Sequence, residues 1–162
     1  MIVNLNSITN EIPINENLII GEKVFLNEKI SNQMLQKSMF GTVTFSNMEF
    51  KDIDFSTSCF VNCVFTNCKF ENCILEKCDF WNSIIESCEL QNCVFTKSSF
   101  HSGTFLNCNF TEGDFRITVF NSIKFIETKF DRNNLDNASF DSSRIWKSNQ
   151  FTFIENSSDL EN

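Results

Sequence analysis

The sequence repeats with a period of five residues, which neither a single long helix nor an ordinary strand can satisfy. From Phe40 to Ile145 every fifth residue is Phe, Leu or Ile, at 22 consecutive positions of which 17 are Phe. Five residues of helix turn through about 500°, so these side chains would point all round a helix, and a strand repeats every two residues. The chain must therefore change direction at each block of five.

The residue two places before each large residue is small. It is Cys, Ser, Thr, Ala or Gly in 17 of the 22 blocks. Residues two apart lie on the same side of an extended backbone. The small and the large residue can therefore both face inward, while the other three positions, mostly polar, face solvent.

Blocks such as NCVF, NCKF, KCDF and NASF resemble the motif of the pentapeptide-repeat family, which is a small residue, Asp or Asn, then Leu or Phe, then two polar positions. The resemblance covers residues 36–145. It implies an all-β fold, a right-handed quadrilateral β-helix with four blocks and hence 20 residues per coil, giving about 5.5 coils roughly 4.8 Å apart. At that period Cys68, Cys88 and Cys108 form an inward column, Cys73 lies under Cys93, and one column of rings is Phe40, Phe60, Phe80, Phe100, Phe120 and Phe140.

Both ends of such a stack need caps, because each end exposes apolar faces and open main-chain edges. We expect residues 1–35 to form an N-terminal cap, 36–145 the β-helix, and 146–162 a C-terminal cap or dimer contact with an acidic tail. The five-residue register would place Lys23 and Glu28 inward, where a charge cannot be buried unpaired. A strand near residues 24–26 and a short helix near 27–36 are therefore expected. The candidate cap or dimer contacts are Trp146, Phe151, Phe153 and Ile154.

Charge and hydropathy exclude several classes. A net charge of -8 argues against direct nucleic-acid binding, which needs clustered Lys and Arg. The N-terminus lacks a basic start followed by an apolar run, and no segment reaches the roughly 18 apolar residues of a membrane span. We expect a cytoplasmic protein with free thiols and no membrane contact.

The eight cysteines favour core packing over chemistry. Zinc sites usually space their Cys pairs two to four residues apart, whereas here the spacing is five, which distributes the thiols over different sides of a coil. Stacked cysteines would project in parallel, which disfavours a disulfide. We therefore interpret the cysteines as small buried core residues, in preference to an occasional disulfide or a metal site. Cys59 stands one place before its large residue, so it should face outward and be the thiol most prone to react.

No catalytic, cofactor or metal residues are expected. His101 is the only histidine, and no Ser or Cys nucleophile can be placed beside it with a carboxylate to orient it. Phosphate-cradling Gly motifs are absent from the sequence as well. An enzyme is the least favoured class.

Two outward surfaces are candidates for partner contact. One is apolar, and is either an interaction surface or a set of residues that merely favour extended backbone; Trp81 is its best single contact. Its members are Val61, Trp81, His101, Ile84, Leu106 and Ile126. The other is acidic but interleaved with Lys and Arg, and is either a solvated face or a partial imitation of DNA. Its members are Glu49, Asp52, Glu71, Glu89, Glu112 and Asp131.

These patterns predict a non-catalytic protein-binding β-helix. The family resemblance implies acidic relatives that bind DNA gyrase and other type II topoisomerases by DNA mimicry, protect them from quinolones or toxins, and dimerise through their C-terminal ends. Two alternatives stay open: an immunity or regulatory protein that binds another partner through the apolar faces near Trp81, and a structural repeat domain whose specificity lies in its termini.

Overall fold

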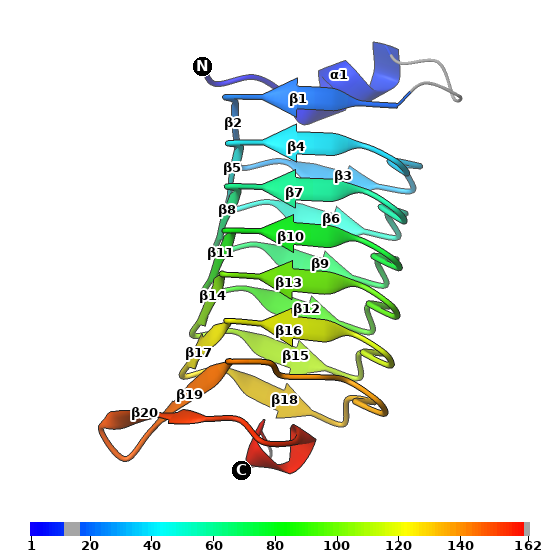
Figure 1. The fold of residues 1–162 in the computed structure, drawn as a ribbon. Helices are drawn as coiled ribbons and strands as arrows, with labels where there is room; N and C mark the ends of the chain where they lie inside the picture. The colour runs from blue at the N-terminus through cyan, green and yellow to red at the C-terminus, as the bar shows by residue number, and fades with distance from the viewer. Residues whose placement is uncertain (12–16, 161–162) are drawn as a thin grey trace.

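The computed structural model describes residues 1–11 and 17–160, which form a column of stacked coils with the N-terminus at one end and the C-terminus at the other (Figure 1). Each coil has four sides, and three of these build sheets in which the strands of successive coils pair in parallel. We name each sheet by its first strand. The β1 face contains β1 (Ile19–Gly21), β4 (Met39–Gly41), β7 (Cys59–Val61), β10 (Asp79–Trp81), β13 (Ser99–His101) and β16 (Val119–Asn121).

The other sides follow the same path. The β2 face contains β2 (Val24–Leu26), β5 (Thr44–Ser46), β8 (Val64–Thr66), β11 (Ile84–Glu86), β14 (Thr104–Leu106), β17 (Lys124–Ile126), β19 (Arg144–Lys147) and β20 (Gln150–Phe153). The β3 face contains β3 (Lys29–Ser31), β6 (Glu49–Lys51), β9 (Lys69–Glu71), β12 (Glu89–Gln91), β15 (Asn109–Thr111) and β18 (Lys129–Asp131). We call the fourth side the bridge face. On it, successive coils are joined by isolated parallel bridges between residues 20 apart, at Met34, Asp54, Ile74, Val94, Asp114 and Asn134.

Successive coils pair at a shift of 20 residues, so the quadrilateral β-helix expected from the sequence is confirmed. Phe60 pairs with Phe40 on one side and Phe80 on the other. Their rings stack at centroid distances of 5.0 and 4.7 Å, and the column continues through Phe100 and Phe120 to Phe140. Stacking of equivalent rings explains the uninterrupted large residue at every fifth position.

Every corner of the coil uses a left-handed backbone conformation. The corner residue stands two places after the large inward residue of each five-residue block. From Glu22 to Ser142 all corner residues have φ between 49° and 61°, and none of them is Gly. Asn tolerates this conformation better than other residues with a Cβ, and it fills ten of the 25 corners. The corners therefore account for the abundant Asn and the near absence of Gly and Pro.

The inward small residues also donate hydrogen bonds across the column. Cys63 Sγ donates to the Phe40 carbonyl at 3.3 Å, and Ser58 Oγ donates to the Leu35 carbonyl at 2.9 Å. The same link to the carbonyl 23 residues earlier recurs along the column at Cys68, Cys73, Cys78, Ser83, Cys88, Ser98, Cys108, Thr118, Thr128 and Ser143. Cys, Ser and Thr are thus selected as small donors and not only as small fillers.

The N-terminal end differs from expectation. The strand near residues 24–26 is present as β2, but the helix expected near 27–36 is wrong: β3 runs through this segment, and the helix is instead α1 (Leu5–Glu11). Glu28 does occupy the inward position and is buried. Its carboxylate accepts hydrogen bonds from the Leu5 and Asn6 main-chain N–H groups at 2.9 and 3.1 Å. The N–H groups at the start of α1, which have no partner within the helix, thus provide hydrogen bonds to the buried Glu28 carboxylate.

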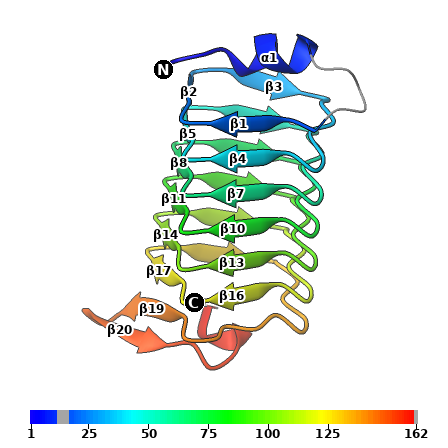
Figure 2. The same cartoon turned by 45° about the horizontal axis from the view of Figure 1, so that its top comes forward.

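Figure 2 shows α1 lying across one end of the column and the β19–β20 hairpin projecting from the other. β20 turns back antiparallel to β19, with Ser148 and Asn149 at positive φ in the turn. After the hairpin, Ile154 and Leu160 bury 95% or more of their surface against the last coil. The C-terminal segment therefore closes the column with two apolar side chains. No helix in the described part of the chain is long and apolar enough to span a membrane.

Candidate interaction surfaces

Within the described part of the chain, the interior provides packing and hydrogen bonding and no assembled chemical site. All eight cysteines are free, and Cys59 alone among them is not buried. Residues 1–11 and 17–160 contain no cluster of three or more His, Cys, Asp or Glu suited to a metal ion. Burial and then the charge of Asp79 raise the pKa of Cys59. This thiol is the most accessible of the eight, yet it ionises less readily than a free one.

Val61, Trp81 and His101 lie side by side on the β1 face. β10 pairs with β7 and β13 so that Trp81 stands between the other two residues. The Trp81 and His101 rings stack at 4.0 Å with an interplanar angle of 14°. Trp81 remains 45% exposed while Val61 and His101 are half-buried. The strand pairing thus brings two aromatic rings into contact and leaves the Trp81 ring open to solvent.

Ile84, Leu106 and Ile126 lie round the corner on the β2 face, in two different rows. Leu106 pairs with Ile126 in the adjacent strand. Ile84 belongs to the other row, where it pairs with Val64 and Thr104 and is 42% exposed. The expected apolar set is therefore two clusters, one at Trp81 and Ile84 on either side of a corner and one further along the column.

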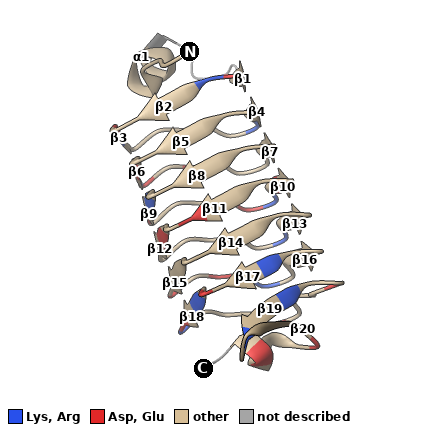
Figure 3. Cartoon of the chain, turned by 90° about the vertical axis from the view of Figure 1, so that its left-hand side faces the viewer, with Lys and Arg blue, Asp and Glu red and all other residues tan. Residues whose placement is uncertain are grey.

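The β1 and β2 faces form an almost uncharged surface over the four coils from Met39 to Thr118. On residues 39–46, 59–66, 79–86 and 99–106 the outward side chains include two carboxylates, Asp79 and Glu86, and no Lys or Arg. In Figure 3, strands β5, β8 and β14 carry no charged residue. We call this surface the uncharged half.

The expected acidic residues lie on the β3 face and its corner toward the bridge face, and a Lys or Arg pairs with four of the six: Glu49, Glu71, Glu112 and Asp131. Lys51 Nζ lies 2.7 Å from Glu71 Oε1, and Lys29 Nζ lies 2.9 Å from Glu49 Oε2, each pair linking successive coils. Arg132 contacts Glu112 at 3.0 Å and Asp131 at 3.4 Å. The same rows also hold Lys69 and Lys129. The face is a ladder of alternating charges and not a one-sided acidic stripe.

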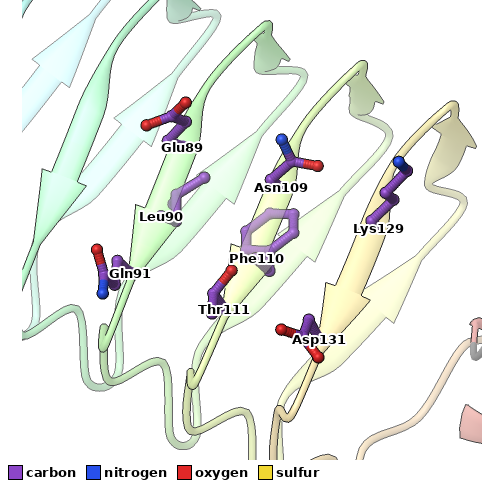
Figure 4. Close-up of a pocket in the computed structure, with 8 residues that line it drawn as sticks. All are labelled: Glu89, Leu90, Gln91, Asn109, Phe110, Thr111, Lys129 and Asp131. Atoms are coloured by element: carbon purple, nitrogen blue, oxygen red, sulfur yellow. The ribbon is translucent and has the colours of Figure 1, made fainter.

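A shallow hollow of about 330 Å³ lies on this ladder (Figure 4). Its polar lining comes from the outward rows of three neighbouring strands: Glu89, Gln91, Asn109, Thr111, Lys129 and Asp131. Leu90 and Phe110 are buried below it. A larger hollow of about 490 Å³ lies beside Lys97 and Ile117 on the bridge face. Both are surface depressions between rows of side chains.

A further row of side chains, not among those expected from the sequence, follows the corner between the bridge face and the β1 face. It consists of Lys37, Thr57, Lys77, Lys97, Ile117 and Asn137, all exposed and all at positive φ. Writing the corner positions at a period of 20 would have revealed it, because the other corners hold mainly Asn and Ser. We call this row the lysine corner.

At the C-terminal end the four expected contact residues divide into two groups. Ile154 is buried in the core. Trp146, Phe151 and Phe153 are 40%, 38% and 60% exposed on the hairpin. Trp146 and Phe151 meet edge to face at 4.9 Å, and the Arg144 guanidinium lies 4.5 Å over the Phe153 ring. The aromatic side chains thus form an exposed patch on a hairpin that Ile154 and Leu160 anchor.

Comparison with known proteins agrees with this architecture. The family model for the pentapeptide repeat region matches residues 63–140. Residues 63–140 therefore match the pentapeptide repeat, within a chain that folds as a quadrilateral β-helix. Among solved structures, this β-helix is similar to full-length QnrB1, a plasmid-mediated fluoroquinolone resistance protein, with 16% identity and a TM-score of 0.55 over 74% of this chain and 71% of QnrB1. A trypsin-treated QnrB1 variant matches at 19% identity and a TM-score of 0.52, over 79% and 71%. A search of curated proteins finds no match.

Proposed function

We propose that this β-helix is a non-catalytic binding protein that holds a protein partner on its uncharged half, with Trp81 as the central contact. One contrast supports the proposal: the β3 face carries interleaved charges of both signs, whereas the stacked and exposed Trp81 ring lies on a surface with almost no charge. Aromatic side chains fixed in advance lose little entropy on binding and dominate many interfaces. The eight free cysteines support a reducing compartment such as the cytosol.

We propose a type II topoisomerase, with DNA gyrase first, as the partner to test. The likeness of fold to QnrB1, a fluoroquinolone resistance protein, supports this choice. Direct apolar contact is a better account of binding than DNA mimicry, because pairs such as Lys51–Glu71 neutralise the carboxylates that a DNA mimic would present. Other protein partners of the same surface remain the alternative function.

The test measures binding of the purified chain to purified gyrase by calorimetry, together with supercoiling with and without a quinolone. We expect Trp81→Ala to weaken binding by at least about tenfold, and raising the salt concentration to weaken it only modestly. Glu71→Gln is the matched control on the β3 face and should change little. A steep salt dependence with loss of binding in Glu71→Gln would instead favour mimicry. Absence of both inhibition and protection would remove gyrase as the partner.

We also propose that the hairpin patch of Trp146, Phe151 and Phe153 joins two copies of the chain at their C-terminal ends. Three exposed aromatic side chains on one short hairpin support an interface. Replacing all three by Ser leaves Ile154 and Leu160 in place, so the column should stay closed. Sedimentation should then show a dimer for the parent chain and a monomer for the variant. A monomeric parent chain at high concentration would contradict this, and would leave the hairpin as a site for other partners.

A further inference from the structure

We propose that the partner segment bound on the uncharged half is acidic, and that Lys77 and Lys97 of the lysine corner bind its carboxylates. This inference rests on the proposed function, because Trp81 and its neighbours supply the apolar part of the same contact. The occupant is therefore a stretch of protein in which apolar side chains alternate with Asp or Glu. Three features of the lysine corner support it.

First, Lys77 and Lys97 stand over one another without a carboxylate between them. The Lys77 N–H donates to the Thr96 carbonyl at 3.0 Å, which places the two lysines at equivalent positions of successive coils, about 4.8 Å apart along the column. Glu76 contacts Lys77 at 3.2 Å, whereas Lys97 forms no ion pair with any described residue. Like charges at this spacing repel. On the β3 face, by contrast, Lys51 stands over Glu71.

Second, these lysines occupy a conformation that favours another residue. Lys77 and Lys97 have φ of 56° and 60°, where a side chain such as Asn is better tolerated. On the opposite edge of the β1 face the equivalent corner residues are Asn62 and Asn82. Nothing in the packing requires long cationic side chains at an exposed corner. Residues that lower the stability of the folded state and make no compensating contact are typical of binding sites.

Third, the lysine corner borders the Trp81 surface directly. Lys77 precedes β10 and Trp81 is its last residue, four residues further along the chain, so an extended backbone separates them by at most about 14 Å. Asp79 lies between them and accepts a hydrogen bond from the Ser99 hydroxyl. A bound extended segment can therefore rest apolar side chains on Trp81 and direct carboxylates to the lysines. Nucleic acid is the less suitable anion, since the chain carries a net charge of -8.

The experiment titrates two short peptides into the labelled full chain and follows main-chain amide shifts by NMR. Both peptides share the same Phe and Leu residues, alternated with Glu in one and with Ser in the other. Lys77→Asn with Lys97→Asn is the test variant, because Asn suits the left-handed corner and the fold should be retained. Lys51→Asn with Lys69→Asn removes the same charge from the β3 face and is the matched control.

We expect the Glu peptide to bind about five- to tenfold more tightly than the Ser peptide at low ionic strength, with shifts at Lys77, Trp81 and Lys97. This advantage should fall below about twofold in the test variant and at high salt, and should persist in the control. Equal affinity of both peptides at Trp81 would overturn the inference and leave the proposed function standing. No shift with either peptide at millimolar concentration would also overturn the inference, while the proposed function would still be decided by the calorimetric test with gyrase. Equal loss in the control, or a single-stranded oligonucleotide binding more tightly at the lysine corner than the Glu peptide, would also overturn the inference.

Discussion

Over the same four coils, the β1 and β2 faces carry two charged side chains, Asp79 and Glu86, whereas the β3 and bridge faces with their corners carry thirteen. The interior does not distinguish these halves. Phe60, below the uncharged half, and Phe110, below the charge ladder, are both at most 2% exposed and stack on an equivalent ring in an adjacent coil at 4.7–5.0 and 4.8 Å. The fold therefore constrains the inward positions and leaves the outward positions free to differ.

This difference indicates where the fold leaves room for function. Exposed residues on a β-helix need only tolerate extended or left-handed backbone, and polar or charged residues do so on every side. A lack of Lys and Arg on two adjoining faces is thus not a requirement of folding. The interleaved charges of the charge ladder offset one another locally, while the uncharged half leaves Trp81 and Ile84 exposed.

The largest effect should come from the shared interior. Phe60→Ala and Phe110→Ala should each lower the free energy of unfolding by about 3–5 kcal/mol, because each leaves a cavity within a stack of rings. Urea unfolding monitored by circular dichroism measures both. Similar losses would confirm that the halves are equivalent inside. A loss at one position more than twice that at the other would show that the interior also differs between the halves.

A smaller, pH-dependent effect should come from the buried thiols. Burial raises the pKa of Cys63 to about 11 and that of Cys78 to about 12, from 9.0 for a free thiol. Above pH 9 the unfolded chain releases protons that the folded chain retains, so stability should fall as the pH rises from about 9 toward 11–12. The slope is about 1.4 kcal/mol per pH unit for each thiol. Below pH 8 these thiols should contribute no slope.

Cys63→Ser combined with Cys78→Ser tests this reasoning, because Ser can keep the hydrogen bonds to the Phe40 and Phe55 carbonyls. The variant should lose part of the alkaline slope while its stability at pH 7 stays close to that of the parent. Unfolding free energies between pH 7 and 11 provide the measurement. Cys59→Ser is the control on the outer surface. An unchanged slope in the double variant would mean that other groups cause the alkaline loss.

The sequence predicts the β-helix because one rule, a large inward residue every five positions, is local and repeated without a break. The end of the column is harder to predict. Whether a buried Glu28 carboxylate is tolerated depends on Leu5 and Asn6, which lie 23 and 22 residues away in the chain. No local sequence pattern predicts that the Glu28 carboxylate pairs with these two N–H groups. The sequence therefore predicts a helix over 27–36, where the structure has β3.

The outward surfaces were predictable in part. Position in the five-residue block places Trp81 and Glu71 outside, and the period of 20 aligns Val61 with Trp81. Exposure is less predictable: Ile154 and Trp146 are both apolar and near the C-terminus, yet the turn at Ser148 and Asn149 buries the first and leaves the second 40% exposed. Writing the corner positions at a period of 20 would have aligned the lysines of the lysine corner, but their left-handed backbone conformation is a feature that composition does not reveal.

A gain of stability is expected at the edge between the two halves. Ile117 is 52% exposed and has φ of 61°, a conformation in which a β-branched side chain is strained. Ile117→Asn should raise the free energy of unfolding by about 1 kcal/mol, since Asn accepts the left-handed conformation. Ile84→Asn is the control, because Ile84 is similarly exposed but lies in β11, where extended backbone favours Ile. Thermal unfolding should shift upward in the first variant only; equal shifts would exclude backbone strain as the cause.

The smallest effect should come from breaking a single rung of the charge ladder. Lys29 and Glu49 are 2.9 Å apart, with side chains 79% and 50% exposed. A double-mutant cycle with Lys29→Gln and Glu49→Gln should give a coupling of about 0.2–1 kcal/mol at low salt and close to zero at 1 M salt, because water and ions screen exposed charges. Urea unfolding at the two salt concentrations measures it. A small coupling would mean that the charge ladder affects the surface potential more than the stability of the fold. The two halves would then lack net charge for different reasons: the β3 face because its charges are interleaved, and the uncharged half because it has almost none. A coupling that persists at 1 M salt would instead make the ladder a structural element of the fold, and the charge difference between the halves would then follow from folding and would not indicate a binding surface.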